Sequence, residues 1–175
     1  MGYISEGFRE AIRLLISFDK EIYSIVFLSL FVSTTATIIA SIICVPLGIH
    51  LGIKDFKGKR LFSRILYAFM SIPSVIVGLI VAILLSRRGP LGQFELLYTP
   101  KAMIIAQTLL VIPLILGLNY SLAKNRGKAI EKVAITLGAK RFDTILLIIR
   151  ELRVDLMVNI VTAFSRAITI FTIKS

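Results

Sequence analysis

The chain has 175 residues, of which 57% are hydrophobic, and its mean hydropathy is +0.89, so it is more apolar than a typical soluble domain. The net charge of +11 would suit nucleic acid, but 13 of the 21 basic residues lie in Lys54–Arg64 and Lys124–Arg153, beside apolar runs. This placement indicates membrane orientation rather than nucleic-acid binding. Several of these runs reach the roughly 20 residues that a helix needs to cross a bilayer. We therefore expect an all-α, polytopic transmembrane helical bundle.

Residue types exclude several kinds of site. Cys44 and His50 are the only residues of their kinds, so the chain has neither an internal disulfide nor a Cys/His zinc site. It also contains no phosphate loop of the GxxxxGK[ST] kind. We expect no catalytic residue, no metal and no cofactor in this chain.

The first predicted element is a short amphipathic helix within residues 1–20. Apolar side chains recur at helical spacing there, at Ile4, Phe8, Ile12 and Leu15. Such a helix lies at the membrane interface or packs on other protein, and the sequence does not decide between the two. Residues 21–175 are predicted to form one transmembrane domain.

Four membrane spans are predicted within that domain. They cover approximately Ile22–Ile53, Leu61–Ser86, Ala102–Leu122 and Leu156–Ile173. Pro46 is a natural kink site in the first span, and the second span contains Pro73. The basic loops 54–64 and 123–155 are expected in the cytoplasm, which places both chain ends outside.

Two polar features interrupt the apolar spans. Ser33, Thr34, Thr35 and Thr37 form a small, polar run in the first span, which predicts either a pore-lining face or simple close packing of helices. Arg166 lies near the middle of the fourth span, where a charge is costly and should face a cavity or a partner group. The alternative for Arg166 is a packing role, in which backbone carbonyls or an interfacial acidic group satisfy the guanidinium.

The basic loop 123–155 has the pattern of two short helices. Lys128–Leu137 contains good helix formers and no proline, and Gly138 can adopt the left-handed conformation that ends a helix. Lys140–Arg153 then restarts as an amphipathic helix. Two helices bent at a glycine form a rigid knob that could enter a groove on a partner. From these residues alone, a basic loop without a partner remains the alternative.

This segment resembles the cytoplasmic coupling loop of importer-type ABC transporter permeases. That loop commonly reads E-A-A, a short spacer, Gly and later an apolar pair. Val133-Ala134, Gly138 and Ile148-Ile149 match these positions, whereas Lys132 replaces the usual Glu and Glu131 precedes it. The resemblance implies that seven residues couple the chain to an ATPase: Lys132, Val133, Ala134, Gly138, Ala139, Lys140 and Arg141.

The resemblance extends over residues 5–168 and narrows to permeases for tungstate and molybdate-like oxyanions. It rests on VSTTATIIA (32–40), VPLGIHLG (45–52), IPSVIVGL (72–79), LLSRRGPLG (84–92), LLYTPKAMIIAQ (96–107), LGAKRFDTILLIIRELR (137–153) and VTAFSRAI (161–168). The IRELR ending is similar to the tungstate subgroup. Import of molybdate, sulfate or phosphate by the same fold is the first alternative, and a membrane anchor without transport is the second.

The resemblance also implies the assembly. An importer-type permease works as two copies in the inner (cytoplasmic) membrane, with an ATP-binding subunit that carries the ATP and an extracytoplasmic substrate-binding protein. It places the hydroxyls of Ser33, Thr34, Thr35 and Thr37, together with Arg166, near the translocation path.

The resemblance is expected to end at Ile168. Ser165 replaces the usual Gly before Arg166, and the family continues with an acidic-Val-Gly stretch and a further transmembrane helix. We therefore expect a C-terminally truncated, four-span part of a five-span permease, for which an inactive fragment is a further alternative.

Overall fold

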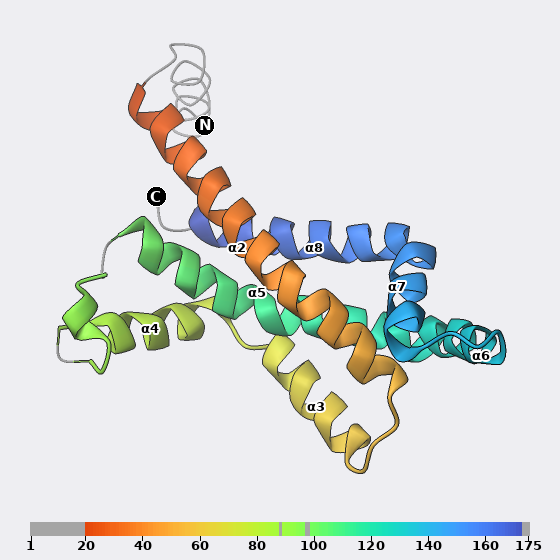
Figure 1. Cartoon of the computed structure of the whole chain (residues 1–175). Helices are drawn as coiled ribbons and strands as arrows, with labels where there is room; N and C mark the ends of the chain where they lie inside the picture. Colours follow the sequence, from red (N-terminus) through yellow and green to blue (C-terminus); the bar gives the residue numbers. More distant parts are fainter. Residues whose placement is uncertain (1–19, 88, 97–98, 173–175) are drawn as a thin grey trace, which may run out of the picture.

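The protein is an elongated bundle of helices (Figure 1). The computed structural model describes residues 20–87, 89–96 and 99–172, and no strand occurs among them. The helices are α2 (Lys20–Ile53), α3 (Lys59–Met70), α4 (Ser74–Leu85), the 3-10 turn η1 (Gly92–Phe94), α5 (Pro100–Leu122), the π-helical turn η2 (Ala123–Gly127), α6 (Lys128–Thr136), α7 (Arg141–Glu151) and α8 (Arg153–Thr172). The amphipathic helix predicted within residues 1–20 lies outside the described residues, except for Lys20, which is the first residue of α2.

Two helices of the described part are long and apolar enough to cross a membrane. Tyr23–Ile53 has 31 residues, and Pro100–Thr136 has 37 because α5, η2 and α6 follow one another without a break. The bent pair α3 and α4 supplies a third candidate. The all-α membrane bundle is thus confirmed, with two or three spans in place of the four predicted. The helix α8 occupies the position of the fourth predicted span. It carries Arg153, Asp155 and Arg166, and it is not one of the helices that are apolar enough to cross a membrane.

A proline divides the second predicted span into two helices. The helix α3 ends at Met70 and α4 begins at Ser74, and the two are bent by 87°. Pro73 has no backbone N–H and disfavours helical geometry at Ile72, so the helical hydrogen-bond ladder cannot continue. The predicted continuous helix from Leu61 to Ser86 is therefore wrong, although both of its halves are helical.

The helix α2 packs against α5 and α8 along a stripe of small residues. The residues of this stripe are spaced four apart along α2, and all of them are buried. They are Val32, Ala36, Ala40, Cys44, Gly48 and Gly52. A Cβ atom on Gly48 would lie 3.0 Å from Asn119 Cβ, and one on Gly52 would lie 2.7 Å from Tyr120 O. Small residues at this spacing let two membrane helices approach until their backbones nearly touch.

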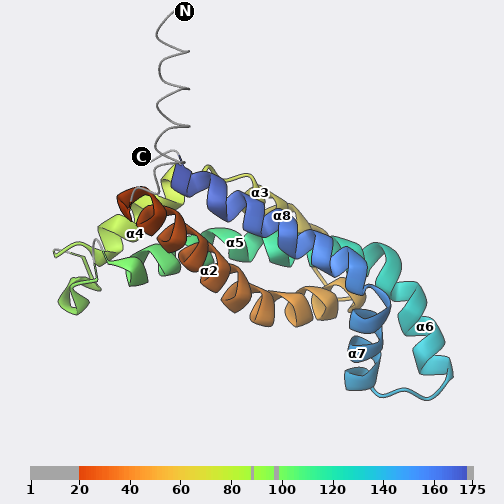
Figure 2. The same cartoon turned by 90° about the horizontal axis from the view of Figure 1, so that it is seen from above.

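Polar side chains hold α8 against α5, and α8 lies along both α5 and α2 (Figure 2). The Asn159 amide donates a hydrogen bond to Asn119 Oδ1 at 3.0 Å, and Gln107 Nε2 donates to Ala167 O at 3.4 Å. Asn119 and Gln107 are buried. These two bonds fix the register of α8 because amides inside an apolar bundle find few other partners.

The two ends of the bundle differ. Both views place α4 at one end of α5 and the helices α6 and α7 at the other (Figures 1 and 2). The outward faces of α2 and α4 are apolar and exposed, with Phe27 and Ile42 on α2 and Val75 and Leu79 on α4. Such faces suit lipid or further protein rather than water.

We predict that Gly52→Val destabilises the bundle. The added side chain collides with Tyr120 O and Ala123 Cβ, each of which would lie 2.7 Å from a Cβ atom at this position. Overpacking of this kind costs about 1–3 kcal/mol. Thermal unfolding in detergent should show a lower midpoint, whereas the matched Gly78→Val change should have little effect, because nothing lies within 4 Å of a Cβ at Gly78. Equal midpoints for the two variants would contradict the close approach.

Candidate functional site

The first candidate site is the α6–α7 hairpin, Lys128–Glu151, which projects from one end of the bundle (Figure 2). Its turn contains Gly138, whose φ is +81°. Gly138 N donates to Ile135 O and Ala139 N donates to Ala134 O, each at 2.9 Å. This pair of bonds is the Schellman arrangement, which satisfies the last carbonyls of α6 and needs a residue at positive φ. The prediction that Gly138 ends the first helix is confirmed.

The second helix of the hairpin begins without a side-chain cap. Lys140 is extended, with φ −74° and ψ 163°, and its carbonyl accepts from both Thr144 N and Thr144 Oγ1. Asp143 lies in the first turn of α7 and Arg150 in the last, which suits the helix dipole at each end.

The hairpin exposes apolar side chains at its free end. Leu137 is 79% exposed and Phe142 is 77% exposed, and Val133, Ile135 and Leu146 are also exposed. Such side chains are expected to be covered when clustered on a rigid projection. The inner sides of the two helices, by contrast, are closed by Ala134 and Thr144, which are buried.

The base of the hairpin is packed into the membrane helices. Ile148 and Leu152 of this region form one buried cluster with Ile49 and Ile53 of α2 and with Ala123. Two ion pairs strengthen the attachment from outside the cluster: Arg126 Nη1 lies 2.6 Å from Asp155 Oδ2, and Lys128 Nζ lies 2.7 Å from Asp55 Oδ1. The hairpin is therefore a rigid extension of the bundle.

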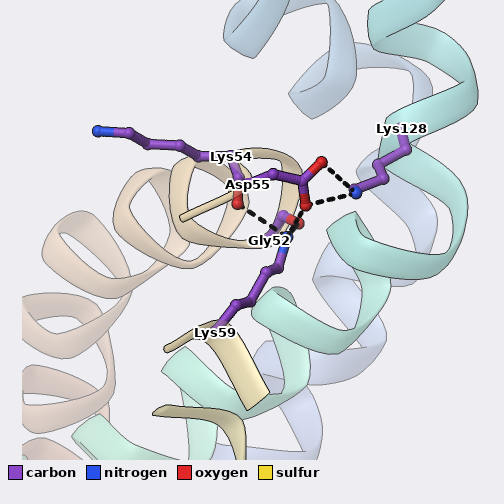
Figure 3. A network of polar contacts seen from close by, with 5 residues as sticks. All are labelled: Gly52, Lys54, Asp55, Lys59 and Lys128. Carbon is purple, nitrogen blue, oxygen red and sulfur yellow. Dashed lines mark hydrogen bonds and ion pairs between the residues drawn. The ribbon is translucent and has the colours of Figure 1, made fainter. Parts of the chain in front are cut away.

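The carboxylate of Asp55 joins the α2–α3 turn to the start of α6 (Figure 3). Both of its oxygens accept from Lys128 Nζ, at 2.7 and 2.8 Å, and Oδ1 also accepts from Lys59 Nζ at 3.3 Å. Lys59 Nζ further donates to the carbonyls of Gly52 and Lys54. Hydrogen bonds from Lys128 and Lys59 hold the pKa of Asp55 below its usual value.

The seven predicted coupling residues all lie in this hairpin but differ in exposure. Ala134 is buried and Ala139 is half-buried. The remaining five are exposed at the surface: Lys132, Val133, Gly138, Lys140 and Arg141. The three basic side chains and Val133 are thus available to a partner, whereas Ala134 has a packing role in the described structure.

The predicted translocation residues are not gathered at one place. Ser33 and Thr37 are buried on the packed side of α2, whereas Thr34 is exposed and Thr35 is half-buried. Thr35 Oγ1 donates to Phe31 O, and Thr37 Oγ1 donates to Ser33 O, each at 2.7 Å. These two hydroxyls therefore serve their own helix.

Arg166 contacts the break between α3 and α4. Its Nη1 donates to Met70 O at 3.1 Å and its Nη2 donates to Ile72 O at 3.4 Å. Carbonyls at a helix end have no intrahelical partner, and a guanidinium with five N–H donors can satisfy several of them at once. The structure thus shows the backbone-carbonyl role that the sequence left open for Arg166.

Asp55 links two distant segments, and the sequence alone does not predict this role. The available signal is that Asp55 is the only acidic residue in the basic loop 54–64. A single carboxylate among lysines and arginines is expected to take a nearby cation as its partner, but its pairing with Lys128, 73 residues further on, needs the fold.

Comparison with known proteins settles the family. Residues 44–174 match the family described as binding-protein-dependent transport system inner membrane component. The chain belongs to this family. The match reaches residue 174, so the prediction that the resemblance ends at Ile168 is wrong.

Three relatives extend the comparison. The tungstate uptake system permease protein TupB of Peptoclostridium acidaminophilum is 64% identical over 169 residues, which cover 97% of this chain and 74% of the relative. The TupB protein of Campylobacter jejuni is 35% identical over 96% of this chain and 70% of its own length. A probable anion ABC transporter permease protein of Haloferax volcanii is 38% identical over 83% of this chain and 63% of its own length.

We predict that Asp55→Asn loosens the junction between the α2–α3 turn and α6. The variant loses the charge that Lys128 and Lys59 share, so amides near Lys54–Lys59 should exchange hydrogen faster while those of α5 are unchanged. Hydrogen exchange followed by mass spectrometry measures this, with Glu95→Gln as a control that removes one negative charge elsewhere. Identical exchange in Asp55→Asn and the unmodified chain would contradict the link.

The same link has a defined pH dependence. The folded-state pKa of Asp55 is lowered by its lysine partners. The stabilisation that ionised Asp55 gives to the junction is therefore fully present above the ordinary aspartate pKa of 3.8, and it is lost as the pH falls through the lower folded-state pKa. The junction should therefore be unchanged between neutral pH and mildly acidic pH.

Proposed function

We propose that this chain is the permease subunit of an ATP-driven importer for tungstate. The observation that carries the substrate is the 64% identity to a tungstate uptake permease over 97% of the chain. The membrane-crossing helices and the projecting hairpin supply what such a subunit needs. The chain carries no chemistry of its own in this proposal, and the ATP is bound and hydrolysed by a partner subunit.

The partner that covers the α6–α7 hairpin is, in this proposal, the ATP-binding subunit. Exposed apolar side chains such as Leu137 and Phe142 would enter a groove, and Lys132, Lys140 and Arg141 would face its rim. Ala134, buried between the two helices, keeps the hairpin narrow. An interface with an apolar centre and a charged rim is the usual arrangement for a specific contact.

The assembly would contain two copies of this chain in the inner (cytoplasmic) membrane. An extracytoplasmic binding protein would deliver the anion at the end of the bundle opposite to the hairpin. The exposed apolar faces of α2 and α4 support contact with lipid and with the second copy. ATP-driven closure of the ATP-binding subunits would then shift the population between inward-open and outward-open states.

The proposed path runs near Arg166. Two of its five donors are engaged by Met70 O and Ile72 O, which leaves N–H groups for an anion. The first turn of α4 begins at Ser74, beyond the same break, and a helix start favours negative charge. Ser33 and Ser41 of α2 each have a buried hydroxyl without a hydrogen-bond partner among the described residues, so these two hydroxyls are the best candidates on α2 to meet a passing anion.

Other oxyanions are the alternative substrates. The Haloferax relative is named only for an anion, and molybdate, sulfate and phosphate have the same tetrahedral shape as tungstate. A membrane anchor without transport is the alternative of a different kind, and the identity to a named permease argues against it.

Uptake measurements test the substrate. Cells without their own tungstate uptake would express this chain with its ATP-binding subunit and binding protein, and would be given labelled tungstate, molybdate, sulfate or phosphate. We expect tungstate to accumulate most, and only when all three proteins are present. Accumulation of tungstate in cells that lack this chain would contradict the proposal. Stronger accumulation of another anion would identify that anion, rather than tungstate, as the substrate.

We predict that Gly138→Val abolishes coupling without preventing membrane insertion. A side chain at φ +81° is disfavoured by about 1–2 kcal/mol, so the turn of the hairpin should reorganise. Uptake and transport-stimulated ATP hydrolysis should fall to background while the amount of protein in the membrane stays normal. Gly78→Val is the matched control, because Gly78 lies in α4 with open space around it. Normal ATPase stimulation in Gly138→Val would contradict the role of the hairpin.

We predict that Arg166→Lys and Arg166→Gln separate the two roles of this residue. Neither lysine nor glutamine can reproduce the pair of hydrogen bonds that Arg166 donates to Met70 O and Ile72 O. Both variants should therefore unfold at a lower temperature. If Arg166 also attracts the anion, Arg166→Lys should keep more uptake than Arg166→Gln at equal protein amounts, because it keeps the charge. Uptake that follows the thermal midpoint alone in both variants would show a purely packing role.

A further inference from the structure

The helix α3 has three different faces. One face packs on α5: Ser63 and Leu66 are buried, and the Phe62 ring meets Tyr120 edge-on at 5.7 Å. A second face is an exposed apolar stripe of Leu61, Ile65 and Phe69, at four-residue spacing. The third face lies beside that stripe and carries Arg60 and Arg64, one turn apart and both exposed. An apolar stripe flanked by basic residues is the pattern of a helix that lies in a membrane interface.

A cleft of about 800 Å³ opens beside the basic face of α3. It is lined by Asp55, Phe56, Gly58, Lys59, Arg60, Leu61, Arg64, Lys124 and Lys128, which include five basic residues and one carboxylate. The lining comes from the α2–α3 turn, from α3, and from η2 and the start of α6. The cleft is therefore built by three segments and has a strong excess of positive charge.

The single carboxylate does not neutralise the cleft. Asp55 is shared between Lys59 and Lys128 (Figure 3). Arg60, Arg64 and Lys124 form no ion pair with any residue in the described part of the chain. Lys124 Nζ and Lys59 Nζ each lie 5.9 Å from the centre of the Tyr120 ring, which helps to hold them near the cleft. Three positive charges from two segments thus converge on a space that holds no counter-charge for them.

We propose that this cleft binds the phosphate of an anionic phospholipid in the cytoplasmic leaflet. Arg60 and Arg64 present guanidinium groups that match phosphate oxygens, and Lys124 adds a point charge from the opposite segment. The stripe Leu61, Ile65 and Phe69 lies along the acyl chains of the same leaflet. The basic loops belong to the cytoplasmic side by the positive-inside rule, and anionic lipids are concentrated in that leaflet.

The apolar stripe favours a lipid over the other candidate ligands. A free phosphate or tungstate ion would use the three cations but gains nothing from Leu61 and Phe69. An ATP-binding subunit could use both surfaces, but in the proposed assembly it docks on the α6–α7 hairpin. The lipid site does not depend on which anion is transported, and its failure would leave the transport proposal intact.

The test is native mass spectrometry of the purified full chain titrated with phosphatidylglycerol or phosphatidylcholine. We expect tight binding of phosphatidylglycerol only. The triple variant Arg60→Gln, Arg64→Gln, Lys124→Gln should weaken it by at least about tenfold, given the attraction of each surface cation for anionic lipid. The matched control is Lys54→Gln, Lys57→Gln, Lys101→Gln, which removes the same charge at exposed residues outside the cleft lining. Equal losses in the two triple variants would overturn the site.

Two further variants keep the result decisive. Arg60→Lys with Arg64→Lys keeps the charge and should keep most of the binding, which excludes misfolding as the cause of a loss. Leu61→Asn with Phe69→Asn should also weaken phosphatidylglycerol binding. Displacement of the lipid by inorganic phosphate, with no effect of Leu61→Asn and Phe69→Asn, would overturn the lipid in favour of a free-anion site. Unchanged lipid binding with loss of the ATP-binding subunit in the cleft variant would overturn it in favour of a protein contact.

Discussion

The close approach of α2 to α5 is the constraint on which the rest of the structure depends. Without a hydrophobic force between helices in lipid, association relies on van der Waals contact, which requires small residues at the interface. Gly48 and Gly52 bring the backbone of α2 against Asn119 and Tyr120. This contact fixes the position of the end of α2. It therefore also fixes the position of the α2–α3 turn and of Asp55 within that turn. The ion pair to Lys128 at the start of α6 follows from that position.

A second constraint joins α8 to the broken pair α3 and α4. Unpaired carbonyls and an unpaired guanidinium are both unfavourable in an apolar bundle, and an arginine placed at bilayer depth costs up to about 2.5–3.5 kcal/mol on insertion scales. The carbonyls of Met70 and Ile72 and the side chain of Arg166 satisfy each other. Hydrogen bonds to a charged group contribute about 1.5–3 kcal/mol, which is enough to offset much of that cost. The break between α3 and α4 and the arginine of α8 thus stabilise each other.

Local sequence predicts some of these features and cannot predict others. The apolar runs and Gly138 depend on residues close in sequence, so the membrane helices and the turn of the hairpin follow from pattern alone. The effect of a proline on a helix is harder to predict from the sequence. Pro46 and Pro113 lie within continuous helices, whereas Pro73 lies at a break between two helices. At the break before Pro73, Arg166 of the distant helix α8 donates to the carbonyls of Met70 and Ile72, a contact that no local pattern contains.

The candidate site shows the same division. Exposure of Lys132, Lys140 and Arg141 follows from charge and from the amphipathic pattern of the two helices. Burial of Ala134 and the pairing of Asp55 depend on contacts across the fold, which no local pattern contains. The sequence predicts a short helix over Lys128–Leu137 that is separate from the third span, whereas α5, η2 and α6 form one continuous helical rod. Basic composition indicates exposure to water, and an exposed segment is as readily helix as loop.

The continuous rod Pro100–Thr136 links the hairpin mechanically to the bundle. Pro100–Thr136 runs from the end of the bundle beside α4 into the hairpin, so a force on the hairpin reaches the bundle through helix backbone. The π turn η2 lies where the rod leaves the bundle, and its Gly127 is closely packed: a Cβ there would lie 3.3 Å from Ile53 and 3.6 Å from Ile148. Close packing at this point prevents the hairpin from swinging alone. If the ATP-binding subunit of the proposed assembly moves the hairpin, that movement would therefore reach α5 and α2 together, and through Arg166 of α8 it would also reach the carbonyls at the break between α3 and α4.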